Sequence, residues 1–547
     1  MAPASRRSAA KPAGPAPPTR TLIIDNGAYT LKAGFSSPSS SSSATSTEPH
    51  SSDSPPDVES KPSIIPNCLA RDREKTVYIG SQLSKCRDFG EIVFRRPVDK
   101  GYLVNWEAEK EIWEHEFFDK KAPLHCDPTE TGLILTEAPN ALPQLQTNCD
   151  QMVFEEFGFA SYYRCTAPTL NAYNDIQTMF PIPIPTRNMA KPQLPAEILL
   201  LIDSGYSHTT ITPLLEGRPI QSAVRRLDVG GKLLTNYLTR LLSLRQYDMR
   251  NDTYLVNEVK EACCYVSRDL KADMERTWKG PKGDRREIYA TGGGIAKDYI
   301  LPDYHNRSKG YVRDHEPAAA GKLKNLTTGK SAEAAEDILT LRNERFTVPE
   351  ILFNPTDIGM KQSGIPRLVM ESLSCIPFGL WPGFLANILV VGGNANIEGF
   401  MFRLEMEIRA LAPAECIVRV GKPADPIIST WQGGAALAKD ANALSKLSVT
   451  KQEYEEHGAA WVARKFDGRT LELPTTLCSK YRWTLEVLAY GDIGAASRAI
   501  GPGCPYCPRL HESVFRMINQ RVFRDYAWPP WAVNDAWTVG SVITDKH

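Results

Sequence analysis

Hydrophobic and polar positions follow the same order in two widely separated stretches of the chain. Residues 21–35 (TLIIDNGAYTLKAGF) and residues 199–213 (LLLIDSGYSHTTITP) each open with an apolar run, pass through Asp-x-Gly, and end in a second, alternating run. Two such runs joined by a short turn rich in Asp and Gly are typical of a β-hairpin. Two copies of the pattern in one chain predict a duplicated α/β fold.

Further apolar patterns predict the elements that follow the hairpins. A buried strand is expected within 131–142 (TGLILTEAPNAL). A second strand is expected within 387–400 (NILVVGGNANIEGF), where a Gly-Gly turn leads into the start of a helix. Apolar residues at helical spacing predict three helices. These cover 148–157 with Asn148 or Asp150 as N-cap, 227–243 beginning after a Gly-Gly turn, and 255–275.

Four segments lack the pattern of a folded core. Residues 1–19 are rich in Ala, Pro and Arg, and residues 36–62 are rich in Ser and Pro, so we expect both to be disordered. Residues 304–346 are charged, show no strand signal, and are expected to form an exposed, partly helical insert that binds a partner. Residues 467–547 form a C-terminal extension without clear periodicity.

The extension contains one recognisable motif, Cys504-Pro-Tyr-Cys507. A Cys-x-x-Cys dithiol is typical of redox domains, in which the first cysteine begins a helix and its thiol pKa is lowered there. Only 40 residues follow the motif, no long buried strand precedes it, and no second Cys pair for a metal site lies nearby. The sequence therefore disfavours a redox or metal-binding role for the extension.

Composition narrows the class of protein. The chain has 547 residues, of which 42% are hydrophobic, enough for two large domains with insertions. Lys plus Arg and Asp plus Glu both number 64, so net charge gives no reason to expect nucleic-acid or membrane affinity. The 12 cysteines are scattered, which favours a reduced intracellular protein. No apolar run approaches the roughly 20 residues of a membrane span.

The hairpin turns carry the candidate chemistry. Gly lets the backbone approach a ligand, and successive backbone N–H groups in such turns form anion sites. An Asp beside them can hold the cation that accompanies a phosphate. The duplicated turns therefore predict a nucleoside triphosphate clamped between two halves of the fold.

In addition, the chain resembles actin and the actin-related proteins over residues 20–466, and the matching segments occur in the family's order. They are DNGAYTLKAGF, FRRPVDKGYLVNWEAEKEIWEHEF, LILTEAP, FEEFGF, DSGYSHTTITP, RLDVGGKLLTNYL, VKEACCYVSRDL, VVGGNANIEGF, TWQGGAALA and TKQEYEEHGAAWVARKF. The resemblance implies two ribonuclease-H-like α/β domains around a nucleotide cleft. The first would comprise 20–174 with 428–466, and the second 175–427.

The resemblance also implies a set of nucleotide contacts, with ATP bound structurally together with Mg²⁺ or not bound at all. Asp25, Asn26, Gly27 and Lys32 match the first phosphate loop, and Lys32 would place its charge on phosphate oxygens. The remaining matches are Asp203 and Gly205 in the second phosphate loop, Gly231 near the ribose, Lys260 and Glu261 beside adenine and ribose, and Gly392 and Gly393 opening a helix that would meet the phosphates.

Several positions depart from the family pattern. Ala28 and Tyr29 stand where the family has a phosphate-binding serine and a glycine. Tyr206 and Ser207 replace the Asp-Gly of the second loop, and Ile427 falls where a lysine usually covers adenine. The two phenols either exclude the terminal phosphate by their bulk or bind it through their hydroxyl groups.

The groups that position the attacking water in the family are also absent. Ala167 stands at the position of a Gln, and Thr210 at the position of a His. His208 lies two residues before Thr210 and would share its face of a strand, but a histidine that faces the surface or the hinge is the favoured interpretation. Because alanine cannot orient water, we expect a protein that is not an enzyme.

Among the actin-related proteins, the sequence motifs are most similar to those of a nuclear subclass. That subclass serves in the Swr-type chromatin remodeller, which exchanges a histone variant into nucleosomes. The resemblance implies a scaffold that binds the remodeller's motor subunit and a zinc-finger HIT-type subunit, and meets nucleosomal histones indirectly. It implies location in the nucleus, with the cytoplasm left open, and no membrane association. A filament-forming cytoskeletal ATPase is the main alternative, and a sugar kinase or chaperone ATPase of the same superfamily is a weaker one.

Overall fold

The computed structural model describes residues 18, 20–36, 61–180, 196–278, 294–304, 307, 309–315 and 336–467. All described helices and strands lie in the first of the chain's two units, Met1–Pro474. The predictions for residues 1–17, for most of 36–62, for 316–335 and for Cys504 and Cys507 fall outside the described residues.

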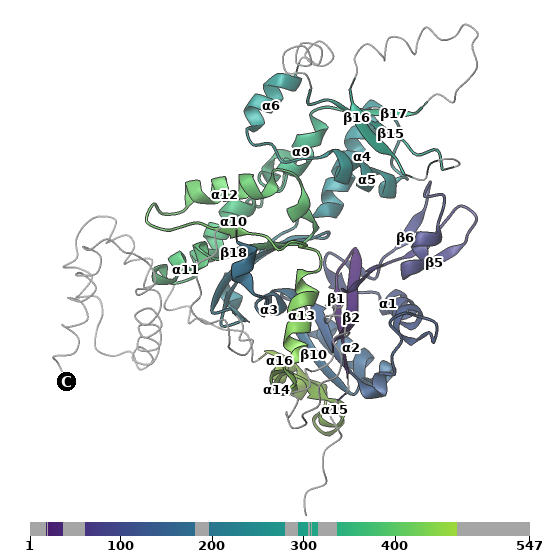
Figure 1. The fold of residues 1–547 in the computed structure, drawn as a ribbon, viewed down its shortest axis with the longest axis vertical. Helices are drawn as coiled ribbons and strands as arrows, with labels where there is room; N and C mark the ends of the chain where they lie inside the picture. The colour runs from purple at the N-terminus through teal and green to yellow at the C-terminus, as the bar shows by residue number, and fades with distance from the viewer. Residues whose placement is uncertain are drawn as a thin grey trace, which may run out of the picture. The chain divides into compact units, whose positions relative to one another are not determined.

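A six-stranded sheet contains the first hairpin. Strands β1 and β2 pair antiparallel, β1, β9 and β10 run parallel, and β3 and β20 close the two edges antiparallel. Figure 1 labels β1, β2 and β10 of this sheet. The strands of this sheet are β1 (Arg20–Asn26), β2 (Thr30–Ser36), β3 (Ser63–Pro66), β9 (Thr131–Glu137), β10 (Ser161–Thr166) and β20 (Val449–Thr450).

A second six-stranded sheet contains the second hairpin. Strands β11 and β12 pair antiparallel, β11, β18 and β19 run parallel, and β13 and β14 both pair antiparallel with β12. The strands are β11 (Ile198–Ser204), β12 (Thr209–Leu215), β13 (Arg218–Pro219), β14 (Arg225–Leu227), β18 (Ile388–Val391) and β19 (Val420–Gly421).

The two sheets repeat one strand pattern. Each joins an antiparallel hairpin to two parallel strands on the side of its first strand. The repetition confirms the duplicated α/β fold that the two hairpins predicted. In each sheet the hairpin turn lies at the carboxyl end of the parallel strands, which is the edge where open α/β sheets bind ligands.

Helices cover both sheets, and we keep the predicted boundaries as labels for two lobes. The first lobe (20–174 and 428–466) contains α1 (Trp106–Trp113), α2 (Pro143–Gln151), α3 (Ala167–Asn171), α13 (Ser429–Lys439), α14 (Ala441–Leu447), α15 (Lys451–His457) and α16 (Ala459–Asp467, one residue past the predicted boundary). The second lobe (175–427) contains α4 (Gly231–Arg245), α5 (Thr253–Cys263), α6 (Leu270–Thr277), α9 (Glu344–Glu350), α10 (Ile365–Leu373), α11 (Trp381–Leu385) and α12 (Phe400–Leu411).

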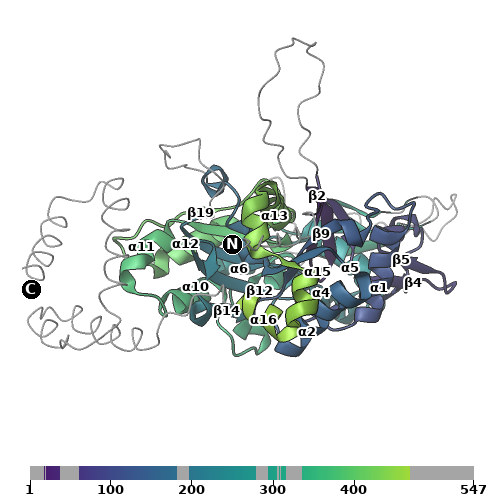
Figure 2. The same ribbon diagram turned by 90° about the horizontal axis from the view of Figure 1, so that it is seen from below.

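Helix α13 returns the chain to the first lobe. It packs against β1, β2 and α3 (Figures 1 and 2). Its Trp431 is buried, and the Trp431 ring lies directly over Gly34 of β2, where a larger residue would overlap it. The first sheet is therefore covered by a helix that follows the whole second lobe in sequence.

Three small sheets complete the described strands. Strands β4 (Leu69–Arg71), β5 (Val77–Ile79) and β6 (Val93–Arg95) form one sheet, and β7 (Val98–Asp99) pairs with β8 (Tyr102–Leu103). Strands β15 (Lys297–Ile300), β16 (Tyr311–Asp314) and β17 (Ile338–Leu341) form the third sheet.

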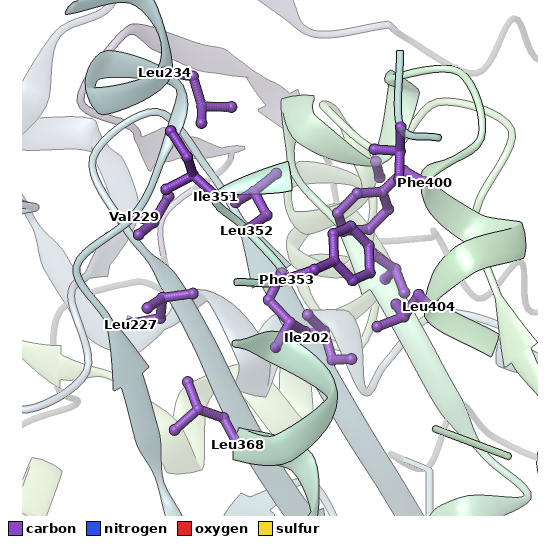
Figure 3. Packing of buried hydrophobic residues seen from close by; sticks show 14 of the residues in the cluster. Ile202, Leu227, Val229, Leu234, Ile351, Leu352, Phe353, Leu368, Phe400 and Leu404 are labelled. Carbon is purple, nitrogen blue, oxygen red and sulfur yellow. The ribbon is translucent and has the colours of Figure 1, made fainter. Parts of the chain in front are cut away.

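Each lobe buries its own apolar core. In the second lobe, Ile202 of β11 packs among residues of α9, α10 and α12. The rings of Phe353 and Phe400 lie 5.6 Å apart above it (Figure 3). In the first lobe, the core includes Trp113, Phe117 and Phe154, whose side chains are fully buried. No helix among the described residues combines the length and apolarity needed to cross a bilayer.

Two predicted helices are wrong in detail. The helix expected over 255–275 is broken after Cys263, because the backbone N–H groups of Tyr265 and Val266 donate to Arg345 and Glu398 instead of continuing the helix. The helix expected over 148–157 begins at Pro143, a residue suited to a first turn, and continues as a π-helix to Phe157. Its predicted caps, Asn148 and Asp150, lie inside the helix.

The segment 304–346 also differs from its prediction. It contributes two strands, β16 and β17, where no strand was expected. In β17 the sequence Ile-Leu-Thr-Leu alternates, with Leu339 and Leu341 buried, which is the pattern of a half-buried strand.

A buried ion pair joins α2 to the first sheet. The side chains of Arg164 on β10 and Asp150 on α2 are both fully buried, and Arg164 Nη1 donates to Asp150 Oδ1 at 3.0 Å. Glu137 lies 3.5 Å from Arg164 Nε. Removing Asp150 leaves the buried Arg164 charge without its hydrogen-bonded partner and with Glu137 at 3.5 Å as a weaker compensating charge.

We predict that Asp150→Ala lowers the free energy of unfolding by about 3–5 kcal/mol. The matched control replaces both partners, Asp150→Leu with Arg164→Met, and should lose much less stability. Urea denaturation followed by circular dichroism measures both. An Asp150→Ala protein that unfolds at the wild-type midpoint would show that the pair does not carry this role.

Candidate nucleotide cleft

The two hairpins place equivalent residues opposite each other. Asp25 pairs with Lys32 across β1 and β2, and Asp203 pairs with Thr210 across β11 and β12. Directly opposed residues in an antiparallel pair lie on the same face of the sheet. Thr210 therefore holds the position in the second hairpin that Lys32 holds in the first.

The first turn is held together by its own polar groups. Lys32 Nζ lies 3.2 Å from Asp25 Oδ2, and both side chains are largely buried. Thr136 at the end of β9 donates its hydroxyl to Asp25 Oδ1 at 3.0 Å and accepts from the Asn26 backbone N–H at 2.9 Å. Gly27 lies in the turn, where its N–H donates to the Asp25 carbonyl. The structure thus brings the four predicted residues of the first loop together.

The second turn contains a carboxyl group that resists ionisation. Burial raises the pKa of Asp203 to about 6, and the charge of Asp25 adds to the rise while Lys32 opposes it. Asp203 therefore interacts electrostatically with both charged groups of the first turn, Asp25 and Lys32. Two carboxylates with one ammonium group leave an excess negative charge that a cation would stabilise.

The Gly-Gly turn after β18 contacts the second hairpin but does not open an α-helix. Gly392 has φ of +93°, and any side chain there would overlap the Ser204 carbonyl. Gly393 begins a short 3-10 helix, Gly393–Asn396, and α12 starts only at Phe400. Asn394 donates its amide to Gly205 O at 2.9 Å. A helix does start at Gly393 as predicted, but it is a short 3-10 helix tied to the second turn through Asn394, and the long helix α12 begins seven residues later.

The predicted ribose and adenine contacts meet at the α4–α5 interface. Lys260 is buried, and its ammonium group donates to Gly231 O at 3.3 Å, to Thr235 Oγ1 at 3.0 Å and to Asn257 Oδ1 at 2.8 Å. Burial lowers the pKa of Lys260. Glu261 is exposed and accepts from the Asn257 amide at 2.8 Å. Because all three donors of Lys260 have partners within the protein, this residue fastens α4 to α5.

The two tyrosines that depart from the family pattern touch each other. The rings of Tyr29 and Tyr206 lie 4.8 Å apart between centroids, with planes inclined by 37°. The guanidinium carbon of Arg96 lies 4.7 Å from the Tyr29 ring centroid and 5.3 Å from that of Tyr206. Arg96 also donates to the carbonyl oxygens of Tyr29 and Asn67, both at 3.2 Å. The two turns are therefore in contact through aromatic side chains.

The positions expected to hold the attacking water carry an alanine and a buried threonine. Ala167 follows β10 as the first residue of α3, and Thr210 is buried opposite Asp203. The His208 ring lies against Gly101 in the turn between β7 and β8, where φ is +87° and a side chain would overlap the ring. Burial and the charge of Arg226 lower the pKa of His208 to about 4. His208 thus contacts the first lobe as a neutral side chain, and its charged neighbours are Arg226 and Asp228.

Sequence reasoning missed four residues that organise the cleft: Thr136, Arg96, Asn257 and Asn394. All four fall within or beside the segments that match the family. Their roles depend on contacts between segments far apart in the chain, as in the pairs Thr136–Asp25 and Asn394–Gly205. An Asn after Gly-Gly is the one local signal, because a side-chain amide can replace a missing helical hydrogen bond.

The residues present fit a nucleotide only in part. The excess negative charge at Asp25 and Asp203 suits a Mg²⁺ ion. A phosphate group that contacts both turns at once does not fit between the touching rings of Tyr29 and Tyr206. A separate cavity, lined by Asn26, Gly101 and Trp106 among others but by no residue of the second turn, has a volume of about 40 Å³, enough for water.

Comparison with known proteins agrees with this architecture. The family model Actin matches residues 16–467, and the chain belongs to the actin family. It is 61% identical to the Actin-related protein 6 of Neurospora crassa over 454 residues, which cover 83% of this chain and 96% of that protein. It is 52% identical over 462 residues to the Actin-like protein arp6 of Aspergillus fumigatus, covering 82% and 95% of the two chains.

A plant relative shows the same similarity at greater distance. The Actin-related protein 6 of Arabidopsis thaliana is 34% identical over 420 residues, which cover 74% of this chain and 93% of that protein. The predicted resemblance to the actin-related proteins, and among them to those named actin-related protein 6, is thereby confirmed, as is the predicted fold class. The nucleotide contacts assigned to individual residues stay predictions.

We predict that Asp203 and His208 give opposite pH dependences of stability. The pKa of Asp203 is raised from 3.8 to about 6, so the contribution of Asp203 to the free energy of unfolding falls as pH rises from about 4 to about 6. The pKa of His208 is lowered from 6.5 to about 4, so its contribution falls as pH drops through that window. Across its own pH window, each group changes the free energy of unfolding by on the order of 3 kcal/mol.

Two single variants separate the contributions. Asp203→Asn should be more stable than wild type at pH 7 and similar at pH 4, so its stability climbs more steeply with pH. Between pH 6.5 and pH 4, wild type should lose stability as pH falls, and His208→Gln should lose less, so the variant gains stability relative to wild type. Urea titrations at four pH values measure both slopes. Parallel pH curves for wild type and either variant would refute the corresponding assignment.

Proposed function

We propose that this chain is a non-catalytic scaffold subunit of a nuclear chromatin-remodelling complex of the Swr type, which exchanges a histone variant into nucleosomes. It binds ATP structurally or not at all. The subclass resemblance supports the complex, since the matching relatives carry the name actin-related protein 6. The observation that carries the non-catalytic role is Ala167 at the start of α3 together with Thr210 opposite Asp203.

Hydrolysis of a phosphoanhydride requires a side chain that positions water in line with the phosphorus. Ala167 has no hydrogen-bonding side chain, and Thr210 is buried within the hairpin. His208 lies against Gly101, and its charged neighbours are Arg226 and Asp228 rather than the cleft carboxylates. Loss of a water-positioning group costs about 10²-fold or more in rate, which supports a scaffold over an ATPase.

The partners in this proposal are the remodeller's motor subunit and a zinc-finger HIT-type subunit, with indirect contact to nucleosomal histones, and the location is the nucleus. The subclass resemblance supports all of them. The alternative function, a filament-forming cytoskeletal ATPase, has the fold in its favour but needs water-positioning groups in the cleft. Pelleting on addition of Mg-ATP would favour that alternative.

We predict that the purified protein releases phosphate from Mg-ATP no faster than its Asp203→Ala variant. Asp203→Ala removes a carboxylate that would orient a cation, so it serves as the inactive control for any activity of this cleft. A steady-state phosphate assay measures both proteins side by side. Turnover comparable with that of actin, abolished by Asp203→Ala, would contradict the non-catalytic role.

We further predict that affinity purification of the nuclear protein recovers a remodeller's motor subunit and a histone variant. Mass spectrometry of the eluate, compared with a mock purification, identifies them. Because a scaffold does not need nucleotide turnover, Asp203→Ala should recover the same set. Recovery of only cytoskeletal proteins would contradict the proposal.

A further inference from the structure

Aromatic and cationic side chains form a continuous chain across the boundary between the lobes. The distance between neighbouring members, measured between ring centroids or between a ring centroid and the guanidinium carbon, is 4.2–6.2 Å. We call this chain the aromatic seam. Its members are Phe89, Tyr254, Phe94, Arg96, Tyr29 and Tyr206.

The outer half of the aromatic seam joins the small sheet β4–β6 to α5. Phe89 of the first lobe stacks on Tyr254 of the second, with centroids 4.2 Å apart and planes inclined by only 9°. Phe94 lies 6.2 Å from Tyr254. Beside this stack, the Glu91 N–H donates to Asp252 Oδ1 at 3.3 Å. Stacked rings and this hydrogen bond attach the outer part of the first lobe to α5.

The inner half joins the two hairpin turns. Tyr29 comes from the first turn and Tyr206 from the second, and Arg96 lies against both rings. On α5, Asn257 lies one turn after Tyr254 and approaches the Tyr29 hydroxyl at 3.5 Å. Burial raises the pKa of both Tyr29 and Tyr206, as expected for phenols withdrawn from water.

A phosphate that contacts both turns must occupy the space between them. Phosphate oxygens and two ring faces cannot share a gap in which the ring centroids are 4.8 Å apart. Entry of such a group therefore requires that Tyr29 and Tyr206 separate and that Arg96 lose contact with at least one ring. An aromatic pair and a cation–π contact would both be broken, and each favours the closed arrangement.

We propose that Tyr29, Tyr206 and Arg96 are the residues that decide what this cleft admits, and that they exclude a nucleoside triphosphate whose terminal phosphate contacts both turns. The aromatic seam closes the lobes through protein side chains alone. The proposal rests on the proposed function in one respect: a scaffold with closed lobes presents one fixed surface to its partners without needing nucleotide.

The test compares binding of Mg-ATP, by displacement of a fluorescent ATP analogue, in the full-length protein and its variants. Tyr29→Ala combined with Tyr206→Ala should improve the dissociation constant at least about tenfold, since the ligand no longer has to separate the rings. Tyr29→Phe keeps the ring and should bind like wild type. Tyr247→Ala removes an exposed tyrosine outside the seam and is the matched control.

Two results would overturn the proposal. One is a double variant that binds Mg-ATP no better than wild type. The other is tight binding by wild type that is weakened by Tyr29→Phe, which would make the hydroxyl group a phosphate ligand. If the double variant does not fold, hydrogen exchange on wild type decides: saturating Mg-ATP should add no protection to residues 25–32 and 203–210, and added protection in both overturns the proposal.

Failure here and failure of the proposed function look different. Tight ATP binding by wild type without phosphate release would refute the proposal that the aromatic seam excludes ATP, but it would not refute the scaffold role. Phosphate release sensitive to Asp203→Ala would remove the non-catalytic role.

Discussion

The contact between Tyr29 and Tyr206 is the interaction on which the arrangement of the cleft depends. Each ring projects from a hairpin turn, and each turn ends a duplicated sheet in which parallel strands direct their carboxyl ends to the same edge. In a fold of this kind that edge is where a ligand binds between two halves. Here protein side chains meet at that edge, with Arg96 against both rings.

The charges beneath the rings are consistent with a cleft whose ligand chemistry has been weakened. Asp25 and Asp203 share Lys32 as their nearest cation, and the pKa of Asp203 is raised to about 6. Lys260, a predicted ribose or adenine contact, uses its three donors to hold α4 against α5. Several residues of the predicted nucleotide site are therefore committed to contacts within the protein.

The sequence predicted those features that depend on local pattern. The two hairpins, the strands after residues 131 and 387, and the grouping of Asp25, Asn26, Gly27 and Lys32 follow from alternation, turn chemistry and a match of motifs. The break after Cys263 could not be predicted in this way, because its cause is pairing with Glu398, more than a hundred residues away. For the same reason, the sequence offered Tyr29 and Tyr206 as separate departures from a family pattern, whereas their meaning lies in their mutual contact.

The most direct test of the central claim is a double-mutant cycle on the free energy of unfolding, with Tyr29→Ala, Tyr206→Ala and the double variant measured in the absence of nucleotide. If the rings hold the two turns together, the sum of the stability losses in the two single variants will exceed the loss in the double variant by a coupling energy of about 0.5–1.5 kcal/mol. Strictly additive losses would show that the tyrosines act independently and would contradict closure of the lobes through their contact.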